Sequence, residues 1–366
     1  MALLEVEDLT VNFYTAEGVV TAVDELSYQI ERGEKFGVVG ESGAGKSVTA
    51  LSLLRLIESP GVIESGEIRF DGEDILEMSE QEVRSIRGNR IAMIFQDAQT
   101  ALNPVYTVGE QIAEAIRHHL GYSDSEAKER TIQLLDRVGI PDADTRYSDY
   151  PHEFSGGMQQ RVVIAMALSC DPDILIADEP TTALDVTTEA KILSLLEELA
   201  DEFDTAVQLI THDLGVVAEL CDRVMVMYAG QPVEKATVEE LYYDPKHPYT
   251  VGLMSSIPRV GDDRDRLQTI PGTMPDLIET PSGCSFHPRC PFAEDACVET
   301  EPQLLDLDTG SKTTSATTRA AKCLEYTGEL VEGLDFEVTV EGDGPVPDEL
   351  HTQPNTNTIS SGDHNE

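Results

Sequence analysis

The sequence predicts an α/β fold with a largely parallel sheet, and two observations carry this prediction. Short apolar runs, typical of strands buried on both faces, alternate along the chain with stretches of helical period. The first run ends in a glycine-rich turn that opens a helix, as strand–helix units in parallel sheets do. The expected strands cover residues 35–40, 90–95, 174–177 and 206–210, and the expected helices cover 46–56, 156–169 and 187–201.

The remaining regions suggest how the chain is divided. Residues 1–30 contain alternating, strand-like segments, and residues 107–139 have a helical spacing of apolar positions such as Ile112, Ile116 and Leu135. We therefore expect an inserted helical subdomain at about 105–170. After Pro258 the chain is rich in Pro, Gly and Asp. We expect a main domain over 1–258, an irregular extension over 259–330 and an acidic, disordered tail over 331–366.

The chain is strongly acidic. It has 69 acidic and 25 basic residues, a net charge of −44, which argues against a nucleic-acid-binding protein. The tail accounts for only part of this charge, since residues 331–366 hold nine acidic residues and no Lys or Arg. Because acidic residues are spread over the whole chain, the composition favours a halophilic host, where salt screens their repulsion.

The sequence does not suggest that this chain crosses a membrane. No apolar run approaches the roughly 18 residues that a membrane-spanning helix needs. The first residues lack the basic region and apolar core of a secretion signal. We expect a cytosolic protein that reaches a membrane only by docking on other subunits.

The sequence Gly-Glu-Ser-Gly-Ala-Gly-Lys-Ser at 40–47 is a complete phosphate-binding P-loop between a predicted strand and a predicted helix. Its glycines let backbone N–H groups approach phosphate, and the start of the helix adds a favourable dipole. The lysine is placed to neutralise the β and γ phosphates, and the last serine to bind Mg²⁺. The expected ATP-binding residues are Gly40, Ser42, Gly43, Gly45, Lys46 and Ser47.

Two carboxylates follow the predicted strand at 174–177. Asp178 and Glu179 stand at the carboxyl end of this strand, the edge where open parallel sheets bind ligands. Asp178 is expected to hold Mg²⁺, and Glu179 to polarise the attacking water. Taken alone, the pair is also compatible with a solvated acidic turn.

A second anion site is predicted at residues 154–161, Phe-Ser-Gly-Gly-Met-Gln-Gln-Arg. Ser155 is a good helix N-cap, and the N–H groups of Gly156 and Gly157 are free to bind an anion. If the helical insertion holds the two anion sites apart, both cannot serve one nucleotide in one subunit. A head-to-tail pair of subunits solves this, with ATP between one P-loop and the second site of the partner.

This segment resembles the Leu-Ser-Gly-Gly-Gln signature of the ATP-binding-cassette (ABC) family, with Met158 in place of Gln. Other motifs of the family follow in order. The resemblance implies that Gln96 binds Mg²⁺ and senses transmembrane subunits, that Asp185 belongs to the loop crossing the dimer interface, that His212 contacts the γ-phosphate and that Phe13 stacks on adenine. It covers residues 1 to about 258 and implies a P-loop NTPase cassette: a RecA-like parallel core, an N-terminal antiparallel β part and a helical subdomain.

Three segments resemble the oligopeptide/dipeptide (peptide/nickel) importers within this family: 96–104, 150–153 and 247–250. The resemblance implies an ATPase that energises peptide uptake from the cytoplasmic face of the membrane. Its implied partners are two transmembrane permeases, a second ATPase, identical or not, and an extracellular substrate-binding protein. The same machinery could import nickel or a sugar.

A soluble ABC ATPase acting on DNA or ribosomes is the alternative from another class. The interval of about 110 residues between P-loop and signature has no sustained heptads, however, and only one cassette is present.

Four of the six cysteines lie in the extension, at Cys284, Cys290, Cys297 and Cys323. In a reducing cytosol, clustered thiols bind metal more often than they form disulfides. Their spacing fits neither a zinc ribbon nor a ferredoxin. By resemblance to the importer group we expect a four-iron four-sulfur cluster, with zinc, and His287 as a substitute ligand, or free structural thiols as alternatives.

Overall fold

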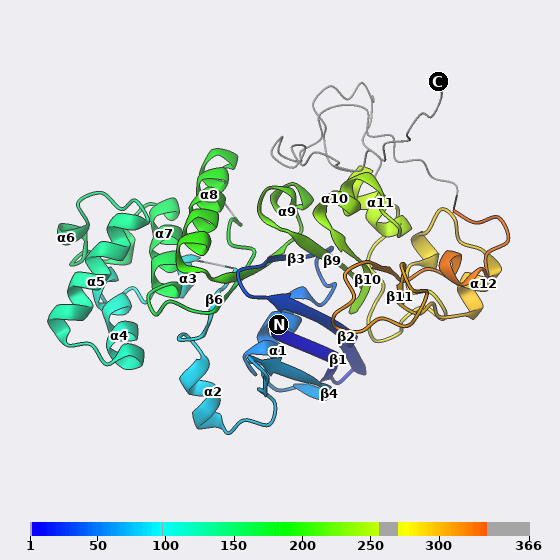
Figure 1. Ribbon diagram of the computed structural model, residues 1–366, viewed down its shortest axis with the longest axis horizontal. Helices are drawn as coiled ribbons and strands as arrows, with labels where there is room; N and C mark the ends of the chain where they lie inside the picture. The colour runs from blue at the N-terminus through cyan, green and yellow to red at the C-terminus, as the bar shows by residue number, and fades with distance from the viewer. Residues whose placement is uncertain (1, 97, 183, 256–269, 335–366) are drawn as a thin grey trace, which may run out of the picture.

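The computed structural model describes residues 2–96, 98–182, 184–255 and 270–334. Figure 1 shows two sheets at the centre, with helices α4, α5 and α6 at one end and the extension that carries β11 and α12 at the other. The predicted boundary near 258, and all of the predicted tail except 331–334, lie outside the described residues.

The N-terminal sheet is antiparallel, as the strand-like pattern of residues 1–30 suggested. Its order is β2-β1-β4-β5. Alternate side chains such as Val6, Tyr28 and Ile30 point into a core shared with Phe36 and Ile176 of the second sheet. The strands are β1 (Ala2–Tyr14), β2 (Val19–Glu31), β4 (Gly61–Phe70) and β5 (Glu73–Asp74).

The second sheet has the order β11-β12-β10-β9-β3-β8-β7-β6 and contains all four strands predicted above. Its five strands from β9 to β6 are parallel, so the carboxyl ends of β3, β7 and β8 meet at one edge. The parallel strands are β3 (Lys35–Val39), β6 (Ile91–Ile94), β7 (Ile174–Asp178), β8 (Ala206–Thr211) and β9 (Arg223–Tyr228), and the antiparallel ones are β10 (Gln231–Thr237), β11 (Leu305–Asp306) and β12 (Ala320–Ala321).

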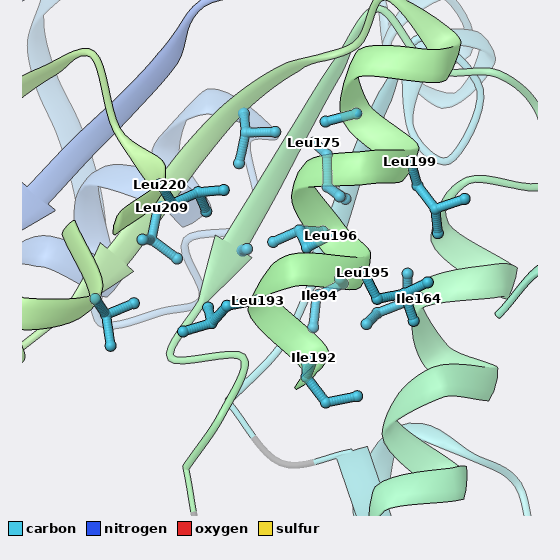
Figure 2. Close-up of a cluster of buried hydrophobic side chains, with 14 of the residues drawn as sticks. Ile94, Ile164, Leu175, Ile192, Leu193, Leu195, Leu196, Leu199, Leu209 and Leu220 are labelled. Atoms are coloured by element: carbon cyan, nitrogen blue, oxygen red, sulfur yellow. The ribbon is translucent and has the colours of Figure 1, made fainter. Parts of the chain in front are cut away.

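Helices cover the parallel strands. Figure 2 shows Leu195 of α8 beside Ile164 of α7, and Leu196 of α8 belongs to the same buried cluster as Leu175 of β7. The helices nearest the sheet are α1 (Lys46–Leu53), α7 (Gly156–Ala167), α8 (Val186–Phe203) and α9 (Leu214–Leu220). The first ends earlier than predicted, since Arg55 adopts a positive φ of 50° just beyond it. Among the described residues, no helix is both long and apolar enough to cross a membrane.

The stretch at 107–139, which has a helical spacing of apolar positions, forms two helices, α4 (Val108–Leu120) and α5 (Asp124–Arg137). Gly121, with φ 68°, ends the first, and Ser123 caps the second with a reciprocal Glu126 bond. The remaining α-helices between β5 and the signature are α2 (Glu80–Ile86), α3 (Ala98–Ala101) and α6 (Ala143–Arg146).

The extension packs onto the main domain through an aromatic cluster. The ring of Phe286 lies 5.2 Å from that of Tyr228, 5.4 Å from Tyr249 and 5.6 Å from His247 (ring centroids). Through β11 and β12 the extension also continues the central sheet, which its irregular sequence did not indicate. The main domain ends in the helices α10 (Val238–Tyr243) and α11 (Pro248–Ser255), and the extension itself contains α12 (Asp295–Glu299).

Replacing Phe286 by Ala is expected to destabilise the protein by about 3 kcal/mol, because a fully buried ring is lost and its three aromatic neighbours cannot refill the space. The measurement is the shift of the thermal or urea unfolding midpoint. Val298→Ala, at an exposed position of the same extension, is the control and should change stability by less than about 0.5 kcal/mol. Equal shifts for both variants would contradict the packing role of Phe286.

Candidate nucleotide site

The P-loop connects the carboxyl end of β3 to the first residue of α1, as predicted. Close packing against the backbone makes two of its glycines necessary. A Cβ on Gly40 would lie 2.3 Å from the carbonyl oxygen of Met227, and one on Gly45 would lie 2.3 Å from that of Ala22. Gly43 and Gly45 also have positive φ, of 86° and 99°. The glycines therefore let the loop pack tightly against the backbones of β9 and β2.

Lys46 is folded back over this loop. Its Nζ donates hydrogen bonds to the carbonyl oxygens of Gly40 (2.7 Å) and Glu41 (3.0 Å). The side chain is buried, and burial lowers the pKa of Lys46, while the carboxylates of Glu179, Asp178 and Glu41 act in the opposite direction. The ammonium thus lies in a poorly solvated position, where a phosphate would compete strongly with the two carbonyl oxygens for its N–H donors.

Asp178 and Ser47 meet beside the lysine and fit a magnesium ion. The Ser47 hydroxyl is hydrogen-bonded to the Asp178 carboxylate, and burial raises the pKa of Asp178. The other carboxylate oxygen, Oδ1, is buried and has no hydrogen-bond partner among the described residues. A buried, unpaired carboxylate oxygen next to a hydroxyl is a set of hard oxygen donors that Mg²⁺ prefers.

Glu179 is the meeting point of three loops. Its Oε2 accepts hydrogen bonds from Nε2 of Gln96 (2.8 Å) and Oγ1 of Thr182 (3.0 Å), and its Oε1 lies 3.2 Å from Nδ1 of His212. The structure therefore brings the predicted Glu179, Gln96 and His212 together. Thr182 was missed by the sequence reasoning, although its position three residues after Glu179, in the turn that follows β7, was a usable signal.

The backbone and charge of Glu179 are both set by its position after β7. Its φ of 47° is unusual for a residue with a Cβ, and its N–H donates to the carbonyl of Ile210 on β8. Burial raises the pKa of this carboxyl, but the hydrogen bonds from Thr182 and His212 outweigh burial, so the pKa lies below its usual value. The side chain is therefore an ionised carboxylate near neutral pH and a competent hydrogen-bond acceptor.

The signature segment begins helix α7 with the predicted cap. Ser155 accepts a hydrogen bond from the N–H of Met158, and Gly156 is exposed. Apart from its chain neighbours and its own helix backbone, no described residue has an atom within 4 Å of the position of a Cβ added to Gly156. A Cβ on Gly157 would lie 3.0 Å from a methyl group of Thr188. Asp185 caps α8 by accepting from the N–H and the hydroxyl of that same Thr188. The signature and the Asp185 loop thus lie side by side.

Phe13 is half-buried and belongs to the N-terminal sheet, not to the P-loop edge. A Cβ on Gly61 would lie 2.7 Å from the ring of Phe13, so the ring covers the β4 strand. The next residue, Tyr14, is more exposed and donates its hydroxyl to Glu64. Adenine stacking on Phe13 stays a prediction.

The four extension cysteines line one small cavity together with His287 and Phe286. Burial raises the pKa of Cys290 to about 12 and that of Cys323 to about 11. Among the described residues, however, no group of three or more His, Cys, Asp or Glu side chains is arranged to hold a metal ion. The thiols fit an iron–sulfur or zinc centre in type and number, but their arrangement here is not a closed ligand set.

Comparison with known families finds two matches. The family described as "ABC transporter" matches residues 23–182, which include the P-loop, the signature and Glu179. The family described as "Oligopeptide/dipeptide transporter, C-terminal region" matches residues 233–297, which include three of the four extension cysteines.

Similar curated proteins cover most of the chain. A putative peptide import ATP-binding protein of Brucella abortus is 53% identical over 300 residues, 82% of this chain and 90% of that protein. The oligopeptide transport ATP-binding proteins OppD of Haemophilus influenzae and Escherichia coli are each 50% identical, over 84% and 82% of this chain and 95% and 89% of theirs.

Solved structures share the fold of the cassette. A dimeric ATP-binding cassette in a post-hydrolysis state, bound to ADP and phosphate, is 28% identical with a TM-score of 0.57 and covers 64% of this chain and 98% of its own. A cassette of a Clostridium perfringens ABC transporter complex has the same identity and TM-score and covers 69% and 95%. With relatives of 50% identity or more over four fifths of its length, the chain belongs to the ATP-hydrolysing subunits of ABC transporters, in the group with the oligopeptide/dipeptide C-terminal region.

Proposed function

We propose that this ATPase energises the import of oligopeptides or dipeptides through two transmembrane permeases, docked at the cytoplasmic face of the membrane. The observation that carries the proposal is similarity across both the cassette and the extension to proteins named for peptide import. Import of nickel or a sugar by the same machinery is the alternative cargo. A soluble ABC ATPase without a transport role is not favoured, because the extension matches a transporter family.

In the proposed cycle two cassettes close on two ATP molecules, head to tail. Lys46 and the P-loop amides, with Gly40, Ser42, Gly43 and Gly45 shaping the loop, hold the phosphates of each ATP. Ser155, Gly156 and Gly157 of the facing subunit, or their equivalents in a different ATPase, contact the γ-phosphate from the opposite side, and the Asp185 loop crosses the interface. The solved ATP-binding cassette that this fold resembles is dimeric and was found with ADP and phosphate, which supports a pairing of two cassettes during the cycle.

Glu179 is the proposed general base. Its ionised carboxylate orients water toward the γ-phosphate, while His212, which already contacts Oε1, stabilises the charge that develops there. Ser47, Asp178 and Gln96 would hold Mg²⁺, which neutralises charge between the phosphates when bound. Phe13 is proposed to stack on adenine, as the resemblance to the family implies.

A pocket beside Gln96 is the proposed permease-docking site. It has a volume of about 580 Å³ and a largely apolar lining from β6, α3, α4 and α7, including Met93, Phe95, Ala101 and Met166. Phe95 is 46% exposed and directly precedes Gln96, the residue bonded to Glu179. An apolar helix of a permease in this pocket would therefore press on the residue that contacts the catalytic carboxylate.

The other partners and the extension complete the proposal. The second ATPase is a copy or a paralogue, and an extracellular binding protein delivers the peptide. Cys284, Cys290, Cys297 and Cys323 would hold a four-iron four-sulfur cluster, or zinc with His287 as a substitute, which would hold an irregular segment together. The net charge of −44 would suit a host with high internal salt.

Peptide uptake is the direct test of the function. Vesicles containing this subunit, its permeases and its partner ATPase should accumulate labelled dipeptide or oligopeptide when ATP is enclosed, and ATPase activity should rise with the binding protein. Uptake of nickel or sugar but not of peptide would refute the proposed cargo, and an ATPase that never responds to permeases would refute transport.

If this pocket is the docking site, a substitution in it should abolish transport without affecting ATP hydrolysis by the isolated subunit. Ala101→Glu should abolish uptake and permease co-purification, because a charge enters an apolar contact, while the isolated subunit keeps its basal ATPase rate. Ser125→Glu, at an exposed position of α5, is the control and should transport normally. Normal uptake by Ala101→Glu would remove the pocket as the docking site.

Glu179→Gln should bind MgATP with near-normal affinity but lose at least about 100-fold in turnover, because the amide keeps the size of the side chain but cannot take a proton. Lys46→Ala is the contrasting variant and should fail at nucleotide binding. The measurements are equilibrium nucleotide binding and steady-state phosphate release. Turnover of Glu179→Gln near that of the wild type would contradict the role of general base.

Anaerobic reconstitution with iron and sulfide tests the cysteine centre. A four-iron cluster should give visible absorption and about four irons per chain, and Cys290→Ser should abolish both. Cys170→Ser, at a buried cysteine outside the extension, is the matched control and should reconstitute normally. Stoichiometric zinc without an iron chromophore would show that the site binds zinc and not a cluster. If no metal binds, the cysteines would be free structural thiols.

A further inference from the structure

Arg289 joins the extension directly to the P-loop, 248 positions away in sequence. Its Nη1 and Nη2 donate to the two carboxylate oxygens of Glu41 at 2.6 and 2.9 Å, a two-pronged ion pair. Glu41 is the second residue of the P-loop. Arg289 lies on the single helical turn His287–Arg289, between Cys284 and Cys290.

The arginine occupies a site built for it. Its side chain is 6% exposed, its Nε donates to the carbonyl of Pro271 at 2.8 Å, and its guanidinium lies 5.7 Å from the ring centroid of Tyr228. Burial with several fixed partners distinguishes this contact from a surface ion pair, which contributes little.

Glu41 is held on three sides. Its carboxylate binds Arg289, its N–H donates to the hydroxyl of Tyr249 at 3.0 Å, and its carbonyl accepts from Lys46 at 3.0 Å. A phosphate that attracts Lys46 would remove the third contact. Arg289 and Tyr249 would then be the contacts that keep this part of the P-loop in place.

Because Glu41 is negatively charged, Arg289 also has an electrostatic role in addition to holding the loop in place. A carboxylate at the edge of a phosphate site repels the nucleotide, and it lies close enough to Lys46 to affect that ammonium electrostatically. A paired guanidinium cancels this repulsion. Loss of the arginine would leave an uncompensated, half-buried carboxylate beside the phosphates.

We propose that Arg289 is a positioning residue for ATP binding: it fixes and neutralises Glu41, so the C-terminal extension sets the nucleotide affinity of the P-loop. The proposal rests on the nucleotide site assigned above. If the wild-type chain failed to bind MgATP, that assignment would fail; if only the variants below behaved otherwise than expected, this inference alone would fail.

The experiment compares MgATP binding, steady-state kinetics and thermal unfolding of the full chain. Arg289→Met should raise the Kd and KM for MgATP about tenfold, with kcat at saturating ATP within about twofold of wild type. Removing the carboxylate as well, in Glu41→Gln/Arg289→Met, should restore the Kd to within about threefold of wild type, because the repulsion is gone. The loss of MgATP affinity in Arg289→Met should be largest at low salt and should become smaller when salt is added, because salt screens the repulsion by Glu41.

Arg223 supplies a matched control. It is paired to Glu34 at 2.6 Å, is 14% exposed and lies 5.4 Å from the ring centroid of Phe36, so it reproduces the arginine–carboxylate–aromatic arrangement at the start of β3. Arg223→Met should lower the unfolding midpoint but leave the Kd unchanged. If Arg289→Met does not fold, Arg289→Lys, which keeps the charge but not the fork, should show an intermediate Kd.

Three outcomes would overturn the proposal. They are an unchanged Kd in a folded Arg289→Met, equal loss of affinity in Arg289→Met and Arg223→Met, and a double variant that binds no better than Arg289→Met. The first outcome would mean that the ion pair only attaches the extension to the main domain. The second would mean that the affinity falls because the protein as a whole is less stable. The third would mean that the charge of Glu41 is not the cause of the weaker binding.

Discussion

The parallel pairing of β3 with β8, and of β8 with β7, is the constraint on which the site depends. Parallel strands carry their carboxyl ends to one edge, and here three consecutive carboxyl ends lead into the P-loop, the Asp178–Glu179 pair and the loop of His212. The strands are buried on both faces, so a change of register would require both faces of the sheet to be repacked. A one-residue slip of β7 would take Asp178 away from Ser47 and Glu179 away from His212.

At this edge, the two neighbouring carboxylates have different surroundings, which shift their pKa values in opposite directions. Asp178 ends the buried strand, where desolvation raises its pKa. One of its oxygens has no hydrogen-bond partner within the described part of the chain, so a cation would stabilise this carboxylate. Glu179 turns outward through a positive φ and collects hydrogen bonds that lower its pKa. Adjacent residues of the same charge thus suit different tasks, one as a ligand and the other as a base.

The sequence predicted the parts of this protein that depend on short-range patterns. Four buried strands, the P-loop, the carboxylate pair and the capped signature helix each need only a few consecutive residues, and the structure has all of them. The break at Gly121 could have been anticipated from glycine followed by a Ser-x-x-Glu capping box. The strands β11 and β12 could not, because two-residue strands carry no period and form only where an exposed edge of β10 accepts them.

The contact between Arg289 and Glu41 marks the limit of sequence reasoning for a different reason. A lone arginine among prolines and a lone glutamate in a glycine loop carry no pairing signal, and only the folded chain brings them together. The extension supplies two strands to the central sheet, a fully buried aromatic ring to the core and a guanidinium to the P-loop. Arg289 directly precedes Cys290, so the residue that holds Glu41 and a residue that lines the cysteine cavity are neighbours in one short segment of the extension. If MgATP affinity depends on the Arg289–Glu41 contact as proposed, a change in the cysteine cavity that displaced Arg289 would also change that affinity, and linkage would require MgATP to bias the cavity in return.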